Sequence, residues 1–269
     1  MKRYLTLLAI LGLALNASGC GGGSRQTETV RLVTYNVGVF NKYIADDYPL
    51  VAAMMKEVGA DAVCLNELDS CTTRTGGVFQ LERIAQLMGS WDYRFGGAMP
   101  YQGGTYGEGV MTRDRAVDKF SVALPQGPGA EPRVLTVVEL DNYVIATTHL
   151  DHKSAAAHLD QIAVINRVMT ERYGDAAKPV FLGGDLNAAP DSETIRTLQE
   201  KWTLLTPTDS GTYPSDRPRK CIDYILQLDN GAKCEVTEAR VLRHFEAGDA
   251  ARASDHLPVL LEVRLPAGK

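Results

Sequence analysis

The feature that most constrains this chain is an apolar run that ends in two glycines and a pair of polar residues. Residues 179–182 read P-V-F-L, and residues 183–190 continue G-G-D-L-N-A-A-P. Side chains at positions i and i+2 of an extended chain lie on the same side, so Asp185 and Asn187 are predicted to leave one strand end together. Glycine allows backbone or ligand to approach closely there. Such a pair suits a metal-bound or phosphate-bound oxygen; the alternative is a strand followed by a polar turn.

The first residues predict export rather than a part of the fold. Lys2 and Arg3 precede an apolar run over residues 5–15, and small residues lead to Cys20. This order is typical of a secretory signal, and the run is too short to span a membrane comfortably. It resembles the bacterial lipoprotein signal, although Ala17 stands where that motif most often has Leu.

We therefore expect a signal peptide over residues 1–19, lipidation at Cys20 and a flexible tether over residues 20–28. The protein is then an exported, membrane-anchored lipoprotein, periplasmic or on the cell surface. Ordinary secretion is the alternative.

Composition bounds the rest of the chain. The 269 residues are 45% hydrophobic, which is enough for one large domain, predicted over residues 29–266. The net charge of −5 argues against non-specific binding of nucleic acid or anionic lipid. Cys64, Cys71, Cys221 and Cys234 allow three disulfide pairings, and Cys221–Cys234 is expected first because the two flank a turn at residues 229–231. No Cys/His spacing indicates a zinc site.

Hydrophobic periodicity predicts a mixture of helices and strands. Helices are expected over residues 48–58, 79–88, 154–173 and 192–200. Strands are expected over residues 30–37, 61–65, 109–112, 120–124, 133–140, 143–148, 222–228, 235–242 and 258–265, and a Gly- and Tyr-rich loop over 96–109. Several strand-to-strand steps favour a layered α/β or α+β fold over a doubly wound parallel sheet.

Five further segments share the pattern of an apolar strand that ends in polar, chemically active residues. They are T-Y-N-V at 34–37, L-N-E-L-D at 65–69, T-T-H-L-D-H at 147–152, I-D-Y at 222–224 and S-D-H-L-P at 254–258. Each has an ordinary explanation: Asn36 caps a turn, Glu67 is a solvated acid, His149 is a core histidine, and Asp223 pairs with an arginine. Six segments of this kind would rarely arise by coincidence, so we expect their polar ends to lie together at one functional site.

Together the segments resemble the endonuclease/exonuclease/phosphatase superfamily, the deoxyribonuclease I-like fold, in that family's order and over nearly all of the mature chain. The resemblance implies a four-layer sandwich, in which two face-packed mixed β-sheets are flanked by helices and the active site lies at one edge of the sheets. It also implies Mg²⁺- or Mn²⁺-assisted hydrolysis of phosphate esters.

The resemblance implies ligands for the metal and the attacking water. Glu67 matches the family's metal-ligand Glu, Asp255 is the expected second carboxylate, and Asn36 matches the Asn that supports metal and phosphate. Asp185 and Asn187 match the pair that holds the water, the phosphoryl oxygens or a second metal. Few carboxylates plus waters and substrate oxygens are what Mg²⁺ prefers.

It also implies an acid–base pair. His256 matches the general base or phosphate contact, and Asp223 is expected to accept its other N–H and favour the imidazolium. His149 matches a second His that aids leaving-group departure or stabilises charge. Glu108 stands where many members have Asn, but the deoxyribonuclease I branch has a Glu there that pairs with the first catalytic His. Glu108 is therefore expected to orient His149 and keep it protonated; an exposed loop acid is the alternative.

The sequence leaves the roles of the other basic residues open. Arg133 either reaches a phosphate or forms a structural ion pair. His152 and His158 are expected to be solvated residues at a helix start rather than extra ligands, and His244 is expected on the surface. The basic segment 217–220 either faces a phosphate or is solvated.

The leading hypothesis is an exported, anchored, divalent-metal-dependent phosphoester hydrolase, a monomer, acting on a small or lipid-derived phosphoester. An extracellular nuclease is the second hypothesis. Nucleic acid is not favoured as a partner, because the chain carries a net negative charge. A non-catalytic surface binding lipoprotein is the third.

Overall fold

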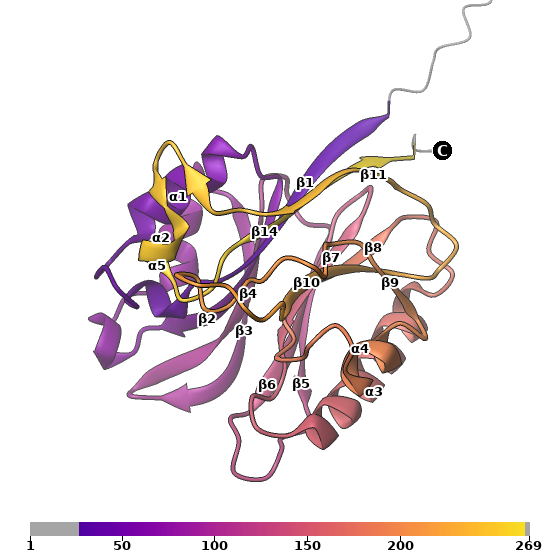
Figure 1. Cartoon of the computed structure of the whole chain (residues 1–269), viewed down its shortest axis with the longest axis horizontal. Coiled ribbons are helices and arrows are strands. Elements are labelled where there is room, and N and C mark those ends of the chain that lie inside the picture. Colours follow the sequence, from indigo (N-terminus) through magenta and orange to yellow (C-terminus); the bar gives the residue numbers. More distant parts are fainter. Residues whose placement is uncertain (1–26, 267–269) are drawn as a thin grey trace, which may run out of the picture.

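The computed structural model describes residues 27–266, and it contains two large β-sheets that pack face to face (Figure 1). The first sheet has the strand order β11-β14-β1-β2-β4-β3, and the second has the order β5-β6-β7-β8-β10-β9. Both are mixed: β1 runs parallel to β2 and β7 runs parallel to β8, whereas their other neighbours are antiparallel. The predicted signal peptide, Cys20 and most of the predicted tether lie outside the described residues.

The strands of the first sheet are β1 (Glu28–Asn36), β2 (Ala62–Ser70), β3 (Asp92–Tyr101), β4 (Gly104–Thr112), β11 (Glu235–Val241) and β14 (Val259–Leu265). Those of the second are β5 (Asp118–Leu124), β6 (Arg133–Glu139), β7 (Val144–His149), β8 (Val180–Asp185), β9 (Trp202–Leu204) and β10 (Asp223–Leu228). A two-stranded pair is formed by β12 (His244–Phe245) and β13 (Gly248–Asp249). The helices are α1 (Tyr48–Glu57), α2 (Gln80–Met88), α3 (Ala155–Tyr173), α4 (Glu193–Leu198) and α5 (Ala250–Ala253), with 3₁₀ turns η1 (Gly38–Phe40) and η2 (Thr73–Thr75).

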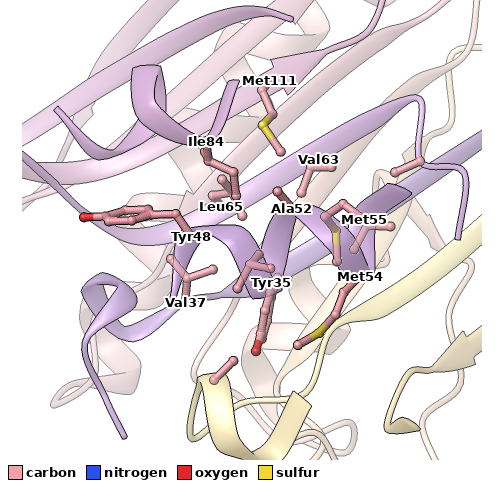
Figure 2. Packing of buried hydrophobic residues seen from close by; sticks show 14 of the residues in the cluster. Tyr35, Val37, Tyr48, Ala52, Met54, Met55, Val63, Leu65, Ile84 and Met111 are labelled. Carbon is pink, nitrogen blue, oxygen red and sulfur yellow. The ribbon is translucent and has the colours of Figure 1, made fainter. Parts of the chain in front are cut away.

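Helices cover the outer face of each sheet, which confirms the four-layer sandwich expected from the sequence. Helices α1, α2 and α5 lie on the first sheet, and α3 and α4 lie on the second (Figure 1). Three apolar clusters separate the layers. One contains Tyr35, Met55 and Ile84 under α1 and α2 (Figure 2), a second lies under α3 and α4, and a third lies between the sheets. In the described part of the chain, no helix combines the length and apolarity needed to cross a membrane.

Strand alternation directs the polar strand ends into the space between the sheets. In β1, Tyr35 packs under the helices, whereas Leu32 packs between the sheets. Asn36 has the same parity as Leu32 and therefore faces the second sheet. In β8, Phe181 packs between the sheets, so Asp185 faces the first sheet by the same rule.

The two glycines of the opening motif allow the layers to come close. A Cβ on Gly183 would lie 3.1 Å from the Cys64 sulfur of the first sheet. A Cβ on Gly184 would lie 1.9 Å from the Thr148 carbonyl oxygen of the neighbouring strand. Larger residues here would push β8 away from both neighbours and move Asp185 with it.

The Gly- and Tyr-rich segment predicted as a loop is instead the hairpin β3–β4. Its glycines mark close packing rather than chain flexibility. A Cβ on Gly96 would clash with Thr136 of the second sheet at 1.9 Å, and one on Gly107 would clash with the Gly96 carbonyl at 2.0 Å.

The expected Cys221–Cys234 disulfide is wrong, because all four cysteines in the described residues are free. Cys221 precedes β10 and Cys234 follows it, so a six-residue strand separates them. Such a strand spans roughly 20 Å, well beyond the ~7 Å Cα limit for a disulfide. No hairpin follows the turn either, since β10 pairs with β8 and β9 while β11 pairs with β14 in the other sheet.

Candidate active site

Three of the predicted site residues stand side by side at one end of the second sheet. In the strand register, His149 of β7 lies opposite Asp185 of β8, and Asp185 lies opposite Asp223 of β10. In the first sheet, Asn36 of β1 lies opposite Asn66 of β2. Since these positions face the space between the sheets, the sandwich brings the strand-end motifs to one place.

One oxygen, Oδ2 of Asp185, lies at the centre of the cluster. The Asn36 side-chain amide donates to it at 3.1 Å, and Nε2 of His149 and Nε2 of His256 lie 3.5 and 3.6 Å away. Asp185 is buried, and burial together with the neighbouring Asp223 carboxylate raises the pKa of Asp185. The backbone N–H of Asn187 donates to its other oxygen at 2.9 Å.

His256 is held from behind by a carboxylate, as predicted. Its Nδ1 lies 3.0 and 3.2 Å from the two oxygens of Asp223. Burial alone would lower the pKa of His256, but the Asp223 and Asp185 carboxylates outweigh it and raise that pKa. The Tyr213 ring packs on the imidazole with centroids 4.9 Å apart.

His149 is held by a guanidinium instead of the expected glutamate. The NH1 group of Arg133 lies 3.4 Å from its Nδ1, while the Asn187 side-chain nitrogen lies 2.9 Å from Nε2. The guanidinium and the amide nitrogen both donate, so each ring nitrogen of His149 faces a donor, an arrangement that disfavours a second ring proton. Burial and the charge of Arg133 lower the pKa of His149 well below its ordinary value. The expectation that His149 is kept protonated is therefore wrong.

Glu108 does not make the predicted contact. It is fully buried, and neither carboxylate oxygen has a hydrogen-bond partner among the described residues. Burial raises the pKa of Glu108 to about 8, although the charge of Arg133 acts in the opposite direction. The exposed-loop alternative is also wrong, since Glu108 lies in β4 opposite Gly96 of β3.

A bulge positions Glu67. The register of β2 against β4 shifts between Leu65 and Leu68, and Glu67 adopts a φ of 58°. Such bulges re-aim side chains, and they are common next to active sites. The Asn36 amide donates to Glu67 Oε1 at 3.0 Å and to Asp185 at 3.1 Å. The two carboxylates therefore lie within reach of one small ligand.

Asp255 is paired with a residue that the sequence did not indicate. The ammonium of Lys42 lies 2.7 Å from Asp255 Oδ2, and this hydrogen bond raises the pKa of Lys42 although burial lowers it. Lys42 follows the η1 turn in a segment without any recognisable motif, so no sequence signal identifies it.

Asn66 is a second missed residue, and it joins the two sheets. Its amide donates to the Thr148 carbonyl at 3.1 Å, and its oxygen accepts from the Asp185 backbone N–H at 2.9 Å. Ser254 similarly donates to the Asn36 carbonyl at 2.6 Å and fixes the S-D-H-L-P segment to the end of β1. Both residues stand within quoted motifs, but their bonding partners are far away in sequence.

The other basic residues considered from the sequence are either buried, as Arg133 and His158 are, or exposed, as His152 and His244 are. Arg133 is 2% exposed and contacts His149, His152 and Glu131. His158 is not solvated as expected: it is buried, with Nδ1 2.9 Å from the Thr194 hydroxyl. His152 is exposed and His244 lies on the surface in β12, as expected.

The cluster opens into a cavity of about 1110 Å³. Its walls include the predicted residues Glu67, Arg133, His149, Asp185, Asn187, Asp255 and His256. Asn36, Glu108 and Asp223 are buried behind this surface. The cavity therefore exposes acids, imidazoles and an amide on one floor.

Two sets of residues could hold a divalent ion. Asp185, Asp223 and His256 offer ligand atoms within 4.8 Å of one another. However, Nδ1 of His256 is already bonded to Asp223, which favours an acid–base role for that trio. Glu67 and Asp255 offer further carboxylate oxygens on the cavity wall, which suit Mg²⁺ or Mn²⁺ better because these ions prefer few carboxylates together with water oxygens. Asn36 does not offer the expected amide ligand, because its nitrogen faces Glu67 and Asp185 while its oxygen accepts from the Gly38 N–H at 3.1 Å.

A model of the endonuclease/exonuclease/phosphatase family matches residues 33–256 of the chain. The chain belongs to the endonuclease/exonuclease/phosphatase family. Membership supports phosphoester hydrolysis as the general class of reaction, and enzymes of this family generally use a divalent metal. No protein with a curated description matches the sequence.

Solved structures share the fold of this endonuclease/exonuclease/phosphatase family member at low identity. A family protein from Bacteroides thetaiotaomicron has a TM-score of 0.70 and 17% identity, over 90% of this chain and 97% of that one. The mannosyl-6-phosphatase of the same organism has a TM-score of 0.69 and 18% identity, over 87% and 99%. The human Nocturnin catalytic domain has a TM-score of 0.65 and 15% identity, over 90% and 97%.

Proposed function

We propose that this protein is an exported, membrane-anchored, Mg²⁺- or Mn²⁺-dependent phosphoester hydrolase that directs water onto a small or lipid-derived phosphoester. The observation that supports the chemistry best is the convergence of one amide and two imidazoles on Asp185 Oδ2, at the floor of a cavity that Glu67 and Asp255 also line. Export and anchoring rest on the sequence of residues 1–28 alone.

Asp185 and Asn187 orient the attacking water, and Asp185 Oδ2 accepts its proton. The raised pKa of Asp185 suits this role, because a base works best when its pKa lies near the operating pH. His256 donates from Nε2 to a phosphoryl oxygen while Asp223 holds its Nδ1–H.

His149 contributes as a neutral donor. With its single ring proton on Nε2 it would stabilise charge on the leaving oxygen, while burial and the charge of Arg133 keep the ring from taking a second proton. Arg133 also lines the cavity, so its positive charge faces the phosphate. Glu67 and Asp255 would hold the ion, which would supply positive charge to the phosphoryl group, while the Asn36 amide fixes Glu67 beside Asp185.

A metal-dependent assay panel tests the proposal. It contains 4-nitrophenyl phosphate, bis-4-nitrophenyl phosphate, plasmid DNA, sphingomyelin and inositol phosphates, with Mg²⁺, Mn²⁺ or EDTA. Turnover should require the ion and should be lost in His256→Ala but retained in the matched variant His244→Ala, whose histidine is exposed and outside the main cavity.

No turnover of any substrate with either ion would favour a binding protein over an enzyme. Plasmid nicking that disappears in His256→Ala would favour the nuclease. For anchoring, equal lack of labelling by a lipid precursor in the parent and in Cys20→Ala would exclude lipidation.

A further inference from the structure

The cavity contains two positive charges that the chemistry above does not use. Five lysines and arginines line it: Lys42, Arg74, Arg133, Arg219 and Lys220. The first three are paired with Asp255, Asp69 and Glu131 at 2.7, 2.6 and 3.3 Å. Arg219 and Lys220 have no carboxylate within 4.0 Å among residues 27–266.

The segment that bears these two charges is held in place by its backbone. The N–H groups of Arg219 and Lys220 both donate to the Tyr213 carbonyl at 2.9 Å, and the Thr212 N–H donates to the Lys220 carbonyl at 2.7 Å. Gly211 allows the close approach of the two arms, since a Cβ there would lie 2.8 Å from the Pro218 carbonyl carbon. The two charges are thus presented on a fixed hairpin.

The same hairpin adjoins the reacting groups. Tyr213 packs on His256 at 4.9 Å, and the Lys220 ammonium lies 5.8 Å from the Tyr213 ring centroid. The cavity volume, about 1110 Å³, exceeds the ~300–1,000 Å³ typical of pockets that hold a small molecule, so room remains beyond a single phosphate.

From this arrangement we infer that Arg219 and Lys220 form a second anion subsite. The substrate is then a small phosphoester that bears a further phosphate or carboxylate group, apart from the phosphate that is cleaved. This inference rests on the proposed function, because it assigns the substrate class of that same site. Two exposed cations act together over a Debye length of about 8 Å, so the subsite favours a phosphoester that carries a second anionic group over one that does not.

A matched set of variants tests the subsite. Inositol 1-phosphate and inositol 1,4-bisphosphate are compared as substrates for the parent, for Arg219→Ala/Lys220→Ala, and for Arg217→Ala as the control. Arg217 is exposed in the same hairpin but does not line the cavity. The double variant should reduce the preference in kcat/KM for the bisphosphate about three- to tenfold, mainly through KM, whereas Arg217→Ala should leave it unchanged.

Calorimetric binding of both compounds in EDTA separates this inference from the proposed function. A bisphosphate preference in dissociation constant that the double variant loses supports the subsite, even if neither compound is turned over and the proposed function fails. Turnover with no difference between the double variant and Arg217→Ala overturns the subsite and leaves the hydrolase intact. The small-substrate assignment is overturned by a different result: the enzyme cleaves a single-stranded oligonucleotide in a manner that depends on Arg219 and Lys220, and it hydrolyses neither inositol phosphate.

Discussion

His256 and His149 both approach the same carboxylate oxygen, at 3.6 and 3.5 Å from Asp185 Oδ2, yet their pKa values shift in opposite directions. Both rings are buried and both direct Nε2 toward Asp185. The difference lies at the remote nitrogen, which meets the Asp223 carboxylate in one case and the Arg133 guanidinium in the other. The Asp223 carboxylate, together with Asp185, therefore makes His256 a cation, whereas burial, reinforced by the charge of Arg133, keeps His149 neutral.

The largest effect is expected from removing the charge behind His256. Asp223→Asn keeps a hydrogen-bond acceptor but removes the carboxylate, so the pKa of His256 should fall and the imidazolium should be lost at neutral pH. We expect kcat to fall about 10²–10⁴-fold. Histidine NMR titration and steady-state kinetics measure the two effects together.

Asp209→Asn is the matched control, because Asp209 also lines the cavity but is exposed. Its kinetics should remain near those of the parent. An unaltered His256 titration in Asp223→Asn would contradict the assigned role of the carboxylate.

The second effect concerns the oxygen that the two histidines share. Asn66→Ala removes the side chain that accepts from the Asp185 backbone N–H and donates to Thr148. Two buried backbone groups then lose their partners, which should lower the free energy of unfolding by about 2–4 kcal/mol. Urea denaturation measures it, and the surface variant Asn142→Ala should change it by less than about 0.5 kcal/mol. Equal midpoints for the two variants would show that Asn66 does not join the sheets.

The strand ends were predictable because each motif is local. The alternation of an apolar strand fixes which side chains leave its end together, so Asp185, Asn187, Asn36 and Asp223 could be placed on a common rim without knowing the packing. The hairpin β3–β4 is not predictable in this way, because glycines that are typical of a loop are required here by neighbouring backbone and by Thr136 of the opposite sheet.

The partners of the site residues were less predictable than the residues themselves. Lys42 reaches Asp255 from a segment with no motif, and Asn66 acts on a strand of the other sheet. Whether Glu108 or Arg133 stands behind His149 depends on how the two sheets pack, which no local pattern encodes. Sequence therefore indicated the reacting groups, and tertiary packing determined their protonation.

A third test removes the guanidinium behind His149. Arg133→Met keeps most of the side-chain volume but removes the positive charge, so the pKa of His149 should rise, while burial still holds it below the ordinary value. The loss of a buried charged donor facing the phosphate should reduce kcat/KM about ten- to a hundredfold.

The His149 NMR signal, assigned by its disappearance in His149→Gln, reports the shift directly. Arg133→Lys restores a charge and should bring the pKa of His149 back down. Identical His149 titrations in parent and Arg133→Met would break the contrast between the two rings.

The smallest effect is expected from Glu108, and it depends on pH. Burial raises the pKa of Glu108 from an ordinary 4.5 to about 8, so the folded protein holds a proton that the unfolded chain releases. The stability contributed by this proton is complete below about pH 4.5 and is lost as pH rises toward 8. Glu108→Gln cannot ionise, so its unfolding free energy should match that of the parent at pH 4 and exceed it by about 1–3 kcal/mol at pH 8–9.

The exposed variant Glu171→Gln should show no such window, since Glu171 is 65% exposed. Turnover of Glu108→Gln should stay within about threefold of the parent and keep the acid limb of its pH–rate profile, because Glu108 does not touch His149. A displaced acid limb would mean that Glu108 moves onto His149 in the working enzyme. The two imidazoles would then share the same kind of partner, and the opposition between a cationic His256 and a neutral His149 would no longer hold.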